Sequence, residues 1–196
     1  MRLNADFSKR VVIRPEDYKW VESPASGVRR MMLDRIGDEV ARATTIVEFA
    51  PGSRFDAHTH GGGEEYLVLS GVFSDDSGDF PEGSYVRNPI GTTHMPHTDQ
   101  GARILVKLHQ FDEADDVQFD VDTKTAEFTA GDAPGLMELM LHAYGSESVS
   151  LLRLAPGTKL PSRKPKGGSE VFVLEVAFED EQGAYPAGSW IRSPHL

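Results

Sequence analysis

Three histidines and a pair of glutamates form the part of the sequence best suited to chemistry. His58 and His60 are separated by one residue, so on an extended segment both side chains point to the same face. Glu64 and Glu65 follow across three consecutive glycines, which can turn tightly. A later block supplies a third imidazole, His94. Three neutral imidazoles and one carboxylate suit a divalent transition metal, so we expect a metal site.

Other polar residues near these blocks have simpler interpretations. Tyr66 has the same strand parity as Glu64, which predicts an inward side chain that either packs in the core or donates a hydrogen bond beside the metal. His97 fits the mouth of a pocket or a plain surface position, and we interpret it as a surface residue. The remaining histidines have no motif and are interpreted as structural: His109, His142 and His195.

Composition excludes several classes of function. The chain of 196 residues has 20 basic and 31 acidic side chains, a net charge of −11, which argues against binding nucleic acid through phosphate contacts. It contains no cysteine, which excludes disulfides, zinc fingers and cysteine nucleophiles. No apolar run reaches membrane-spanning length, and the first residues lack the apolar core of a signal peptide. We therefore expect a cytoplasmic protein that binds neither membrane nor nucleic acid.

The elements that must position these residues are expected to be short β-strands. Glycine and proline interrupt the chain every ten residues or so, and apolar or alternating segments of strand length lie between them. Only residues 135–143 have apolar residues at helical spacing. This pattern predicts an all-β sandwich or barrel. The strand-like segments are residues 44–50, 66–73, 103–111, 117–121, 150–155 and 171–178.

An internal repeat with an offset of 105 residues predicts a duplicated domain. Residues 50–52 match 155–157, and residues 78–89 match 183–194 without a gap. We expect a metal-binding domain with an N-terminal arm over residues 1–112 and a second, degenerate domain over residues 117–196. The second repeat stops before its last strand or two, so either the natural chain is longer or another element closes its sheet.

The two histidine blocks resemble the cupin motifs. The first runs from Gly52 to Gly71 as glycine, five residues, His-x-His, three or four residues, glutamate, six residues and glycine. The second runs from Gly83 to His94 and contains Pro-x-Gly, two residues and histidine; Thr98 stands where this motif usually ends in asparagine. The resemblance implies two tandem jelly-roll barrels of the double-stranded β-helix type. It also implies metal ligands at His58, His60, Glu64 and His94.

More narrowly, residues 20–110 resemble the cupin domain of ChrR-type anti-sigma factors. The shared features lie in residues 27–30, 33–35, 60–65 and 87–89. This resemblance implies zinc and a regulatory, ligand-sensing function with a small molecule or a regulatory protein as partner. The N-terminal sigma-binding domain of those factors, with its own His/Cys zinc site, has no counterpart here. The alternative is a cupin metalloenzyme, such as a small-molecule dioxygenase, for which iron, manganese or nickel would replace zinc.

The second repeat helps to choose between Glu64 and Glu65. It has Ser169 where Glu64 stands, but it keeps Glu65 as Glu170. The glutamate that disappears together with the histidines is the better ligand candidate, so Glu65 is interpreted as a structural hydrogen-bonding residue. The two histidine positions become Arg163 and Pro165, so we expect no metal in the second repeat. The cupin resemblance also implies a homo-oligomer, in which subunits pair through exposed strand edges.

Overall fold

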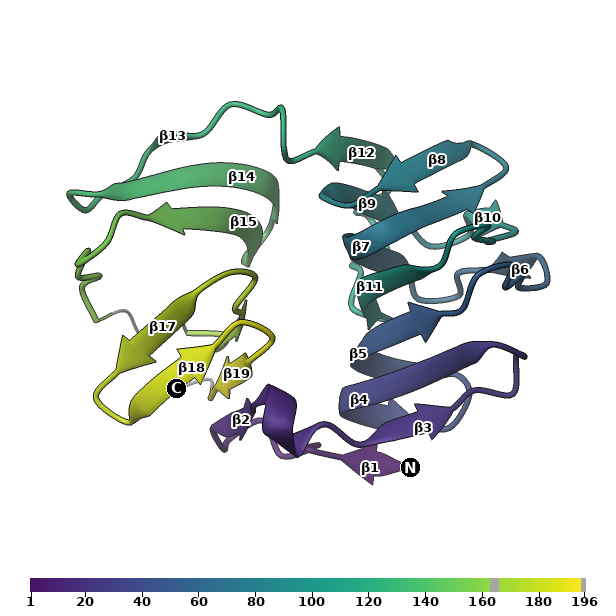
Figure 1. Cartoon of the computed structure of the whole chain (residues 1–196), viewed down its shortest axis with the longest axis horizontal. Coiled ribbons are helices and arrows are strands. Elements are labelled where there is room, and N and C mark those ends of the chain that lie inside the picture. The colour runs from purple at the N-terminus through teal and green to yellow at the C-terminus, as the bar shows by residue number, and fades with distance from the viewer. Residues whose placement is uncertain (163–165, 195–196) are drawn as a thin grey trace.

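The computed structural model describes residues 1–162 and 166–194 and confirms the all-β prediction (Figure 1). Within those ranges there is no α-helix, and none of the elements is a helix able to cross a membrane. One 3-10 turn, Pro15–Asp17, follows the second strand. The first half of the chain contains β1 (Arg2–Leu3), β2 (Val11–Ile13), β3 (Trp20–Glu22), β4 (Val28–Gly37), β5 (Ala41–Phe49), β6 (His58–Thr59), β7 (Glu64–Asp75), β8 (Gly78–Pro81), β9 (Ser84–Asn88), β10 (Thr93–His94) and β11 (Ala102–Leu108). The second half contains β12 (Phe119–Asp122), β13 (Thr129–Ala130), β14 (Leu136–Tyr144), β15 (Glu147–Leu154), β16 (Ser169–Phe172), β17 (Ala177–Asp180), β18 (Gly183–Pro186) and β19 (Trp190–Ser193).

The first half folds around a continuous sheet in the order β1-β4-β5-β11-β7-β9-β12, while β6 and β10 form a separate two-stranded ribbon. Alternate residues of the central strands point inward and build the core of this barrel. In the middle of the sheet, Ile104 of β11 lies opposite Val47 of β5 on one side and Val68 of β7 on the other. Tyr66, which was predicted to point inward, is 1 % exposed, and so is Val68, two residues further along β7.

The second half repeats this plan in three smaller sheets: β13-β14-β15, β16-β19-β2 and β17-β18. The duplication is visible in the turns, where Ala50 N donates to Gly27 O at 2.7 Å and Ala155 N donates to Gly135 O at 2.9 Å. The helical spacing noted at residues 135–143 is misleading, because this segment is strand β14. A bulge in β14 at residues 140–142 inserts an extra residue, which breaks the period-2 alternation.

The two halves exchange one strand each, β2 and β12. Strand β2, from the start of the chain, pairs with β19 of the second half, so that Val11 lies opposite Arg192. Strand β12, which opens the second repeat, pairs with β9 of the first half, so that Phe119 lies opposite Arg87. Each exchanged strand therefore pairs with a sheet on the other side of the boundary between the repeats. The domain bounds 1–112 and 117–196 stay a prediction.

A mixed interface joins the two halves beside these exchanged strands. Trp190, 1 % exposed, packs in a cluster with Met31, Leu33 and Ile46 of the first half. Arg192 Nη1 donates to Asp34 Oδ2 at 2.9 Å in a buried ion pair. Met31 is thus buried in the core, whereas Met137 and Met140 of β14 are 39 % and 53 % exposed.

Candidate metal centre

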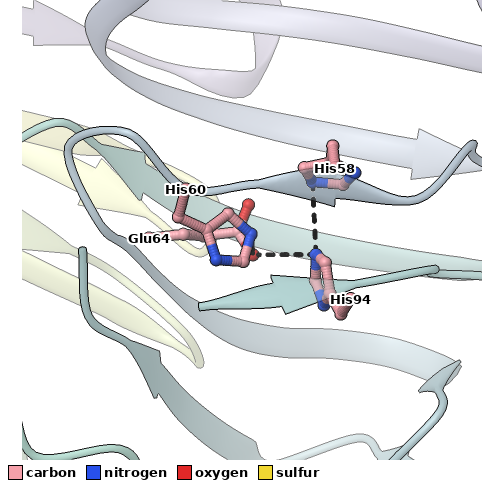
Figure 2. A group of neighbouring side chains, drawn as sticks. All are labelled: His58, His60, Glu64 and His94. Carbon is pink, nitrogen blue, oxygen red and sulfur yellow. Dashed lines mark hydrogen bonds and ion pairs between the residues drawn. The ribbon is translucent and has the colours of Figure 1, made fainter. Parts of the chain in front are cut away.

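Four side chains, three of them on strands β6, β7 and β10 and one in the turn after β6, converge on one another (Figure 2). They are His58, His60, Glu64 and His94, and one ligand atom of each lies within 4.8 Å of those of the other three. His94 Nε2 lies 3.3 Å from His58 Nε2 and 3.5 Å from Glu64 Oε1. His60 Nε2 also lies 3.5 Å from Glu64 Oε1. The structure thus brings together all four residues that the sequence analysis selected as ligands.

The β6–β10 ribbon positions two of the imidazoles. In its antiparallel register His58 lies directly opposite His94, and Thr59 lies opposite Thr93. Cross-strand neighbours of this kind have adjacent side chains on one face of the ribbon. The His-x-His segment therefore faces the third histidine because two short strands pair, although they are 34 residues apart in the sequence.

A turn of three glycines then carries the chain from His60 to Glu64. Gly63 has φ = +77°, and a Cβ atom there would lie 2.2 Å from the ring of Phe111. A Cβ atom at Gly62 would lie 2.2 Å from the ring of His109. The turn is thus packed against the segment after β11, and only glycine fits at these two positions. This close packing fixes where β7 begins and brings Glu64 to the histidines.

Each histidine is oriented by a hydrogen bond at Nδ1. His58 Nδ1 lies 3.0 Å from the carbonyl oxygen of Asp56, and His94 Nδ1 lies 3.0 Å from Asp75 Oδ2. His60 Nδ1 lies 2.8 Å from Thr92 Oγ1, whose own hydrogen is donated to a carbonyl oxygen. All three partners act as acceptors, so in the neutral rings Nδ1 carries the proton and Nε2 keeps its lone pair. Three lone pairs and a carboxylate oxygen face one another.

The electrostatics of the cluster favour a cation at its centre. Burial lowers the pKa of His60 to about 3, and the nearby rings of His94 and His58 add to this effect. Burial raises the pKa of Glu64, although His94 and His58 oppose that shift. Burial also disfavours the Asp75 carboxylate, but hydrogen bonds from His94 and Ser77 lower the pKa of Asp75 to about 2. A neutral imidazole and a desolvated carboxylate both gain from a divalent ion.

Two observations indicate that these four residues could hold a metal ion. His60 Nε2 and Glu64 Oε1 are buried, and neither makes a hydrogen bond with any part of the chain that the structure describes. Ligand atoms about 2.1 Å from a zinc ion at tetrahedral corners would be separated by about 3.4 Å. The three short separations in the cluster, 3.3, 3.5 and 3.5 Å, match that spacing. The cluster of three histidines and one glutamate is therefore suited to a metal.

Glu65 lies on the opposite face of β7 from Glu64. Its Oε2 accepts hydrogen bonds from Tyr85 Oη at 2.6 Å and from Arg87 Nη1 at 2.8 Å. Arg87 also bonds to Asp115 and Glu147, so this network connects the first half to the second. Glu65 therefore makes structural hydrogen bonds, as expected, and its side chain does not contact the histidine cluster.

The other candidates lie away from the cluster. Tyr66 is in the barrel core, and its buried hydroxyl has no hydrogen-bond partner among the residues described. His97 is half-buried, and its backbone bonds to Ser74. His142 Nε2 lies 2.8 Å from Asp115 Oδ2. Thr98 is buried and donates to Val72 O at 2.7 Å, which is a structural role. Ser169 begins β16, whereas Arg163, Pro165 and His195 lie outside the described residues.

Two residues at the site were missed by sequence reasoning. Asp75 and Thr92 do not belong to the ligand set, but each holds the Nδ1 atom of one histidine. Thr92 lies inside the second motif, between Gly91 and His94, so its position near the site could have been predicted. Asp75 lies at the far end of β7, and no spacing in the sequence connects it to His94.

The family follows from the comparison with family models. The model described as the ChrR cupin-like domain matches residues 8–112 and again residues 116–196, which together are nearly the whole chain. The chain belongs to the ChrR cupin-like family. The ChrR-like resemblance of residues 20–110 is thereby confirmed, and the family match extends to the second repeat. Comparison with curated proteins gives no match.

Solved structures confirm the cupin fold over the full length. A protein of Nostoc punctiforme, provisionally described as a dioxygenase, is 14% identical with a TM-score of 0.75, covering 96% of this chain and 76% of that one. A provisionally named glyoxylate-induced protein of Pseudomonas aeruginosa is 16% identical with a TM-score of 0.76, covering 95% and 80%. ChrR of Rhodobacter sphaeroides, solved with SigE, is 26% identical over 48% of this chain and 51% of that one, with a TM-score of 0.42.

Proposed function

We propose that this protein is a regulatory, ligand-sensing cupin that holds one zinc ion through His58, His60, Glu64 and His94. The observation that carries the proposal is the convergence of three Nε2 lone pairs and a carboxylate oxygen within 4.8 Å of one another, with three of the separations at 3.3, 3.5 and 3.5 Å. The three histidine protons are held at Nδ1, so none of them lies between the ligand atoms. Bound zinc would supply a fixed positive charge and a Lewis acid at this place. Membership of the ChrR cupin-like family supports the sensory role.

The residues around such a site have different roles in ligand access and in orienting the histidines. His60, Glu64 and His94 are buried, whereas His58 is only half-buried on the short strand β6. His58 therefore stands where a small ligand from solvent would first meet the centre. Asp75 and Thr92 keep His94 and His60 in place when a ligand arrives, because their hydrogen bonds fix both rings.

We propose that the second repeat holds no metal and has a structural role. At the place of Glu64 it has a serine, Ser169, and the two histidine positions are occupied by an arginine and a proline. An arginine stays protonated and a proline side chain has no donor atom, so this set cannot bind a divalent ion. The expected homo-oligomer stays a prediction, and β1 and β12, at the two ends of the large sheet, are among the strand edges that could form it.

A second candidate, a cupin metalloenzyme such as a small-molecule dioxygenase, is favoured by one observation. The hydroxyl of Tyr66 is buried without a hydrogen-bond partner in the described part of the chain. Burial raises the pKa of Tyr66, and the charge of Glu64 adds to the effect, so the phenol stays protonated. It is free to donate a hydrogen bond to a small molecule inside the barrel. An enzyme would use this donor to orient its substrate.

The metal content and its effect on stability test the first proposal. We expect one equivalent of zinc in the purified protein by elemental analysis. Removal by a chelator should lower the melting temperature, because an ion that binds only the folded state stabilises it by mass action. His58→Ala should abolish this zinc-dependent stabilisation. His97→Ala, a change of the same type at a half-buried histidine outside the cluster, should leave it unchanged.

Oxygen consumption decides between the two candidates. Iron at full occupancy, together with O₂ uptake on a panel of dicarbonyl and phenolic compounds, would overturn the regulatory proposal. In that case His58→Ala and Tyr66→Phe should both reduce the uptake. Two metal ions per chain would contradict the proposal for the second repeat.

A further inference from the structure

Glu64 faces a second buried polar side chain across the sheet. In the pairing of β7 with β9, Glu64 lies directly opposite Asn88, so the two side chains stand on the same face of the sheet. The neighbouring pair, Glu65 and Arg87, occupies the other face, where the two side chains form an ion pair. Asn88 is 3 % exposed, so its amide is buried on the face that carries the carboxylate of the histidine cluster.

The two ends of the Asn88 amide have different surroundings. Its Oδ1 accepts a hydrogen bond from Gln118 Nε2 at 2.9 Å. Its Nδ2 is buried and makes no well-formed hydrogen bond with the described part of the chain. The amide is nevertheless near enough to Glu64 to oppose the rise that burial causes in the pKa of that carboxyl group. Because Gln118 holds one end of the amide, the free N–H groups at the other end are available to Glu64.

Gln118 belongs to the second repeat. It directly precedes β12, the exchanged strand, whose Phe119 lies opposite Arg87 of β9. The next position along the same two strands brings the Gln118 side chain to Asn88. Figure 1 shows β12 beside β9 at the edge of the first barrel. The exchange of β12 therefore places a residue of the second repeat one side chain away from the histidine cluster.

The positions of the amide and the glutamine differ in the second half, where we propose no metal. The offset of 105 residues puts Ser193 at the place of Asn88. The exchanged strand β2 pairs with β19 as β12 pairs with β9, and this alignment puts Arg10 at the place of Gln118. The amide and the glutamine are thus replaced together with the proposed metal ligands, which supports a shared role.

We propose that Gln118 and Asn88 are positioning residues of the metal centre: Gln118 fixes the amide of Asn88, and Asn88 donates to the carboxylate of Glu64. The inference rests on the metal site proposed above. Glu64 Oε1 lies 3.5 Å from both His60 Nε2 and His94 Nε2, so this oxygen is the one turned towards the ion. The amide holds the other oxygen, which keeps the carboxylate from rotating out of the site. Strand β12 of the second repeat thereby completes a site whose ligands all lie in the first.

A reversal of hydrogen-bond polarity at Gln118 separates this role from a plain effect of charge. In Gln118→Glu the side chain keeps its shape but can only accept, so it draws the N–H groups of Asn88 away from Glu64. We expect the zinc affinity to fall by about threefold to tenfold, as for other residues that orient ligands. A plain effect of charge has the opposite sign, because an added carboxylate attracts a cation. Gln100→Glu, at an exposed glutamine before β11, should leave the affinity unchanged.

Asn88→Ser tests the path between Gln118 and Glu64. It should lower the zinc affinity by about tenfold, because the shorter side chain cannot reach the carboxylate. Gln118→Glu should then have no further effect in the Asn88→Ser background, since its path to Glu64 is lost. Competition with a zinc-binding dye measures the affinities. The absorption of the cobalt-substituted protein should change in both single variants, and a loss of stability alone would not alter it. Urea unfolding with a chelator present measures the stability of each variant separately.

Three results would overturn the proposal and leave the metal site standing. They are a zinc affinity of Gln118→Glu equal to or higher than that of the wild type, additive losses in the double variant, and unchanged cobalt spectra. A wild-type protein that binds no metal would overturn both the metal site and this inference. Because Gln118 is exposed, Gln118→Glu should fold even if Asn88→Ser does not, and its zinc affinity alone then decides the question.

Discussion

At the scale of single residues, the site depends on which nitrogen of each imidazole carries the proton. A backbone carbonyl, a hydroxyl already used as a donor and a carboxylate each accept from an Nδ1 atom. The ligand nitrogens are therefore set before any ion arrives. Such pre-orientation reduces the entropy lost on binding, because the rings need not be ordered by the metal.

Asp75 provides the sharpest test of this orientation. We expect Asp75→Asn to weaken zinc affinity by about tenfold to a hundredfold, because the amide cannot hold His94 Nδ1–H as the carboxylate does. Asp76→Asn, at the exposed neighbouring carboxylate, should leave the affinity unchanged. Competition with a zinc-binding dye measures the affinity, and the absorption of the cobalt-substituted protein reports the ligand geometry. Equal affinities and spectra for the two variants would remove Asp75 from the site.

At the scale of elements, the glycine turn between β6 and β7 controls where Glu64 lies. Gly63→Ala should reduce the free energy of unfolding by about 2 kcal/mol or more, because a left-handed residue gains a Cβ atom that meets Phe111. It should also weaken metal binding, since the start of β7 must shift. Urea unfolding and zinc titration measure the two effects.

Gly52→Ala is the matched control for this turn. Gly52 also has φ = +77°, but a Cβ atom there meets nothing within 4 Å. The strain of the backbone is thus common to both variants, and only the contact with Phe111 differs. If Gly52→Ala lowered stability and zinc affinity as much as Gly63→Ala, the packing of the turn would not be what positions Glu64.

The elements also show what could be predicted from the sequence and what could not. The four clustered residues could be predicted from the motif spacing, because each motif fixes a local hairpin or turn. Strand β14 was obscured by its bulge, which places apolar residues at helix-like spacing. The exchange of β2 and β12 was not predictable, since the alternation in residues 119–122 suits the edge of either sheet. The contact of Asp75 with His94 could not be predicted, because the two residues lie on separate strands and no motif connects them.

At the scale of the whole molecule, Glu170 connects the halves through an ion pair. Its carboxylate accepts hydrogen bonds from Lys107 Nζ at 2.6 Å, Thr44 Oγ1 at 3.2 Å and Trp190 Nε1 at 3.3 Å. Burial opposes the charged form, but the positive charge of Lys107 and these hydrogen bonds hold the pKa of Glu170 below its ordinary value. The repeat equivalent, Glu65, connects β7 and β9 in the same way.

This lowered pKa predicts how stability depends on pH. Because the folded pKa of Glu170 is below the unfolded value of about 4.3, its contribution is present above that pH. It is lost as the pH falls through the folded pKa. Glu170→Gln should therefore cost about 1–2 kcal/mol at neutral pH, with a smaller difference from the wild type in acid. Urea unfolding of both proteins over a pH series, with a chelator present, measures this. Glu175→Gln, at an exposed glutamate, should show no such pH-dependent difference.

The exchange of β2 and β12 also sets the order of events when the chain is made. Strand β2 emerges from the ribosome long before its partner β19, since Ile13 pairs with Trp190. Neither half can complete its own sheet while the other is missing. Contacts so distant in sequence slow folding, and the nascent chain must keep an apolar edge unpaired while it waits. We therefore expect the yield of folded protein to depend on translation speed and chaperones as well as on its final stability.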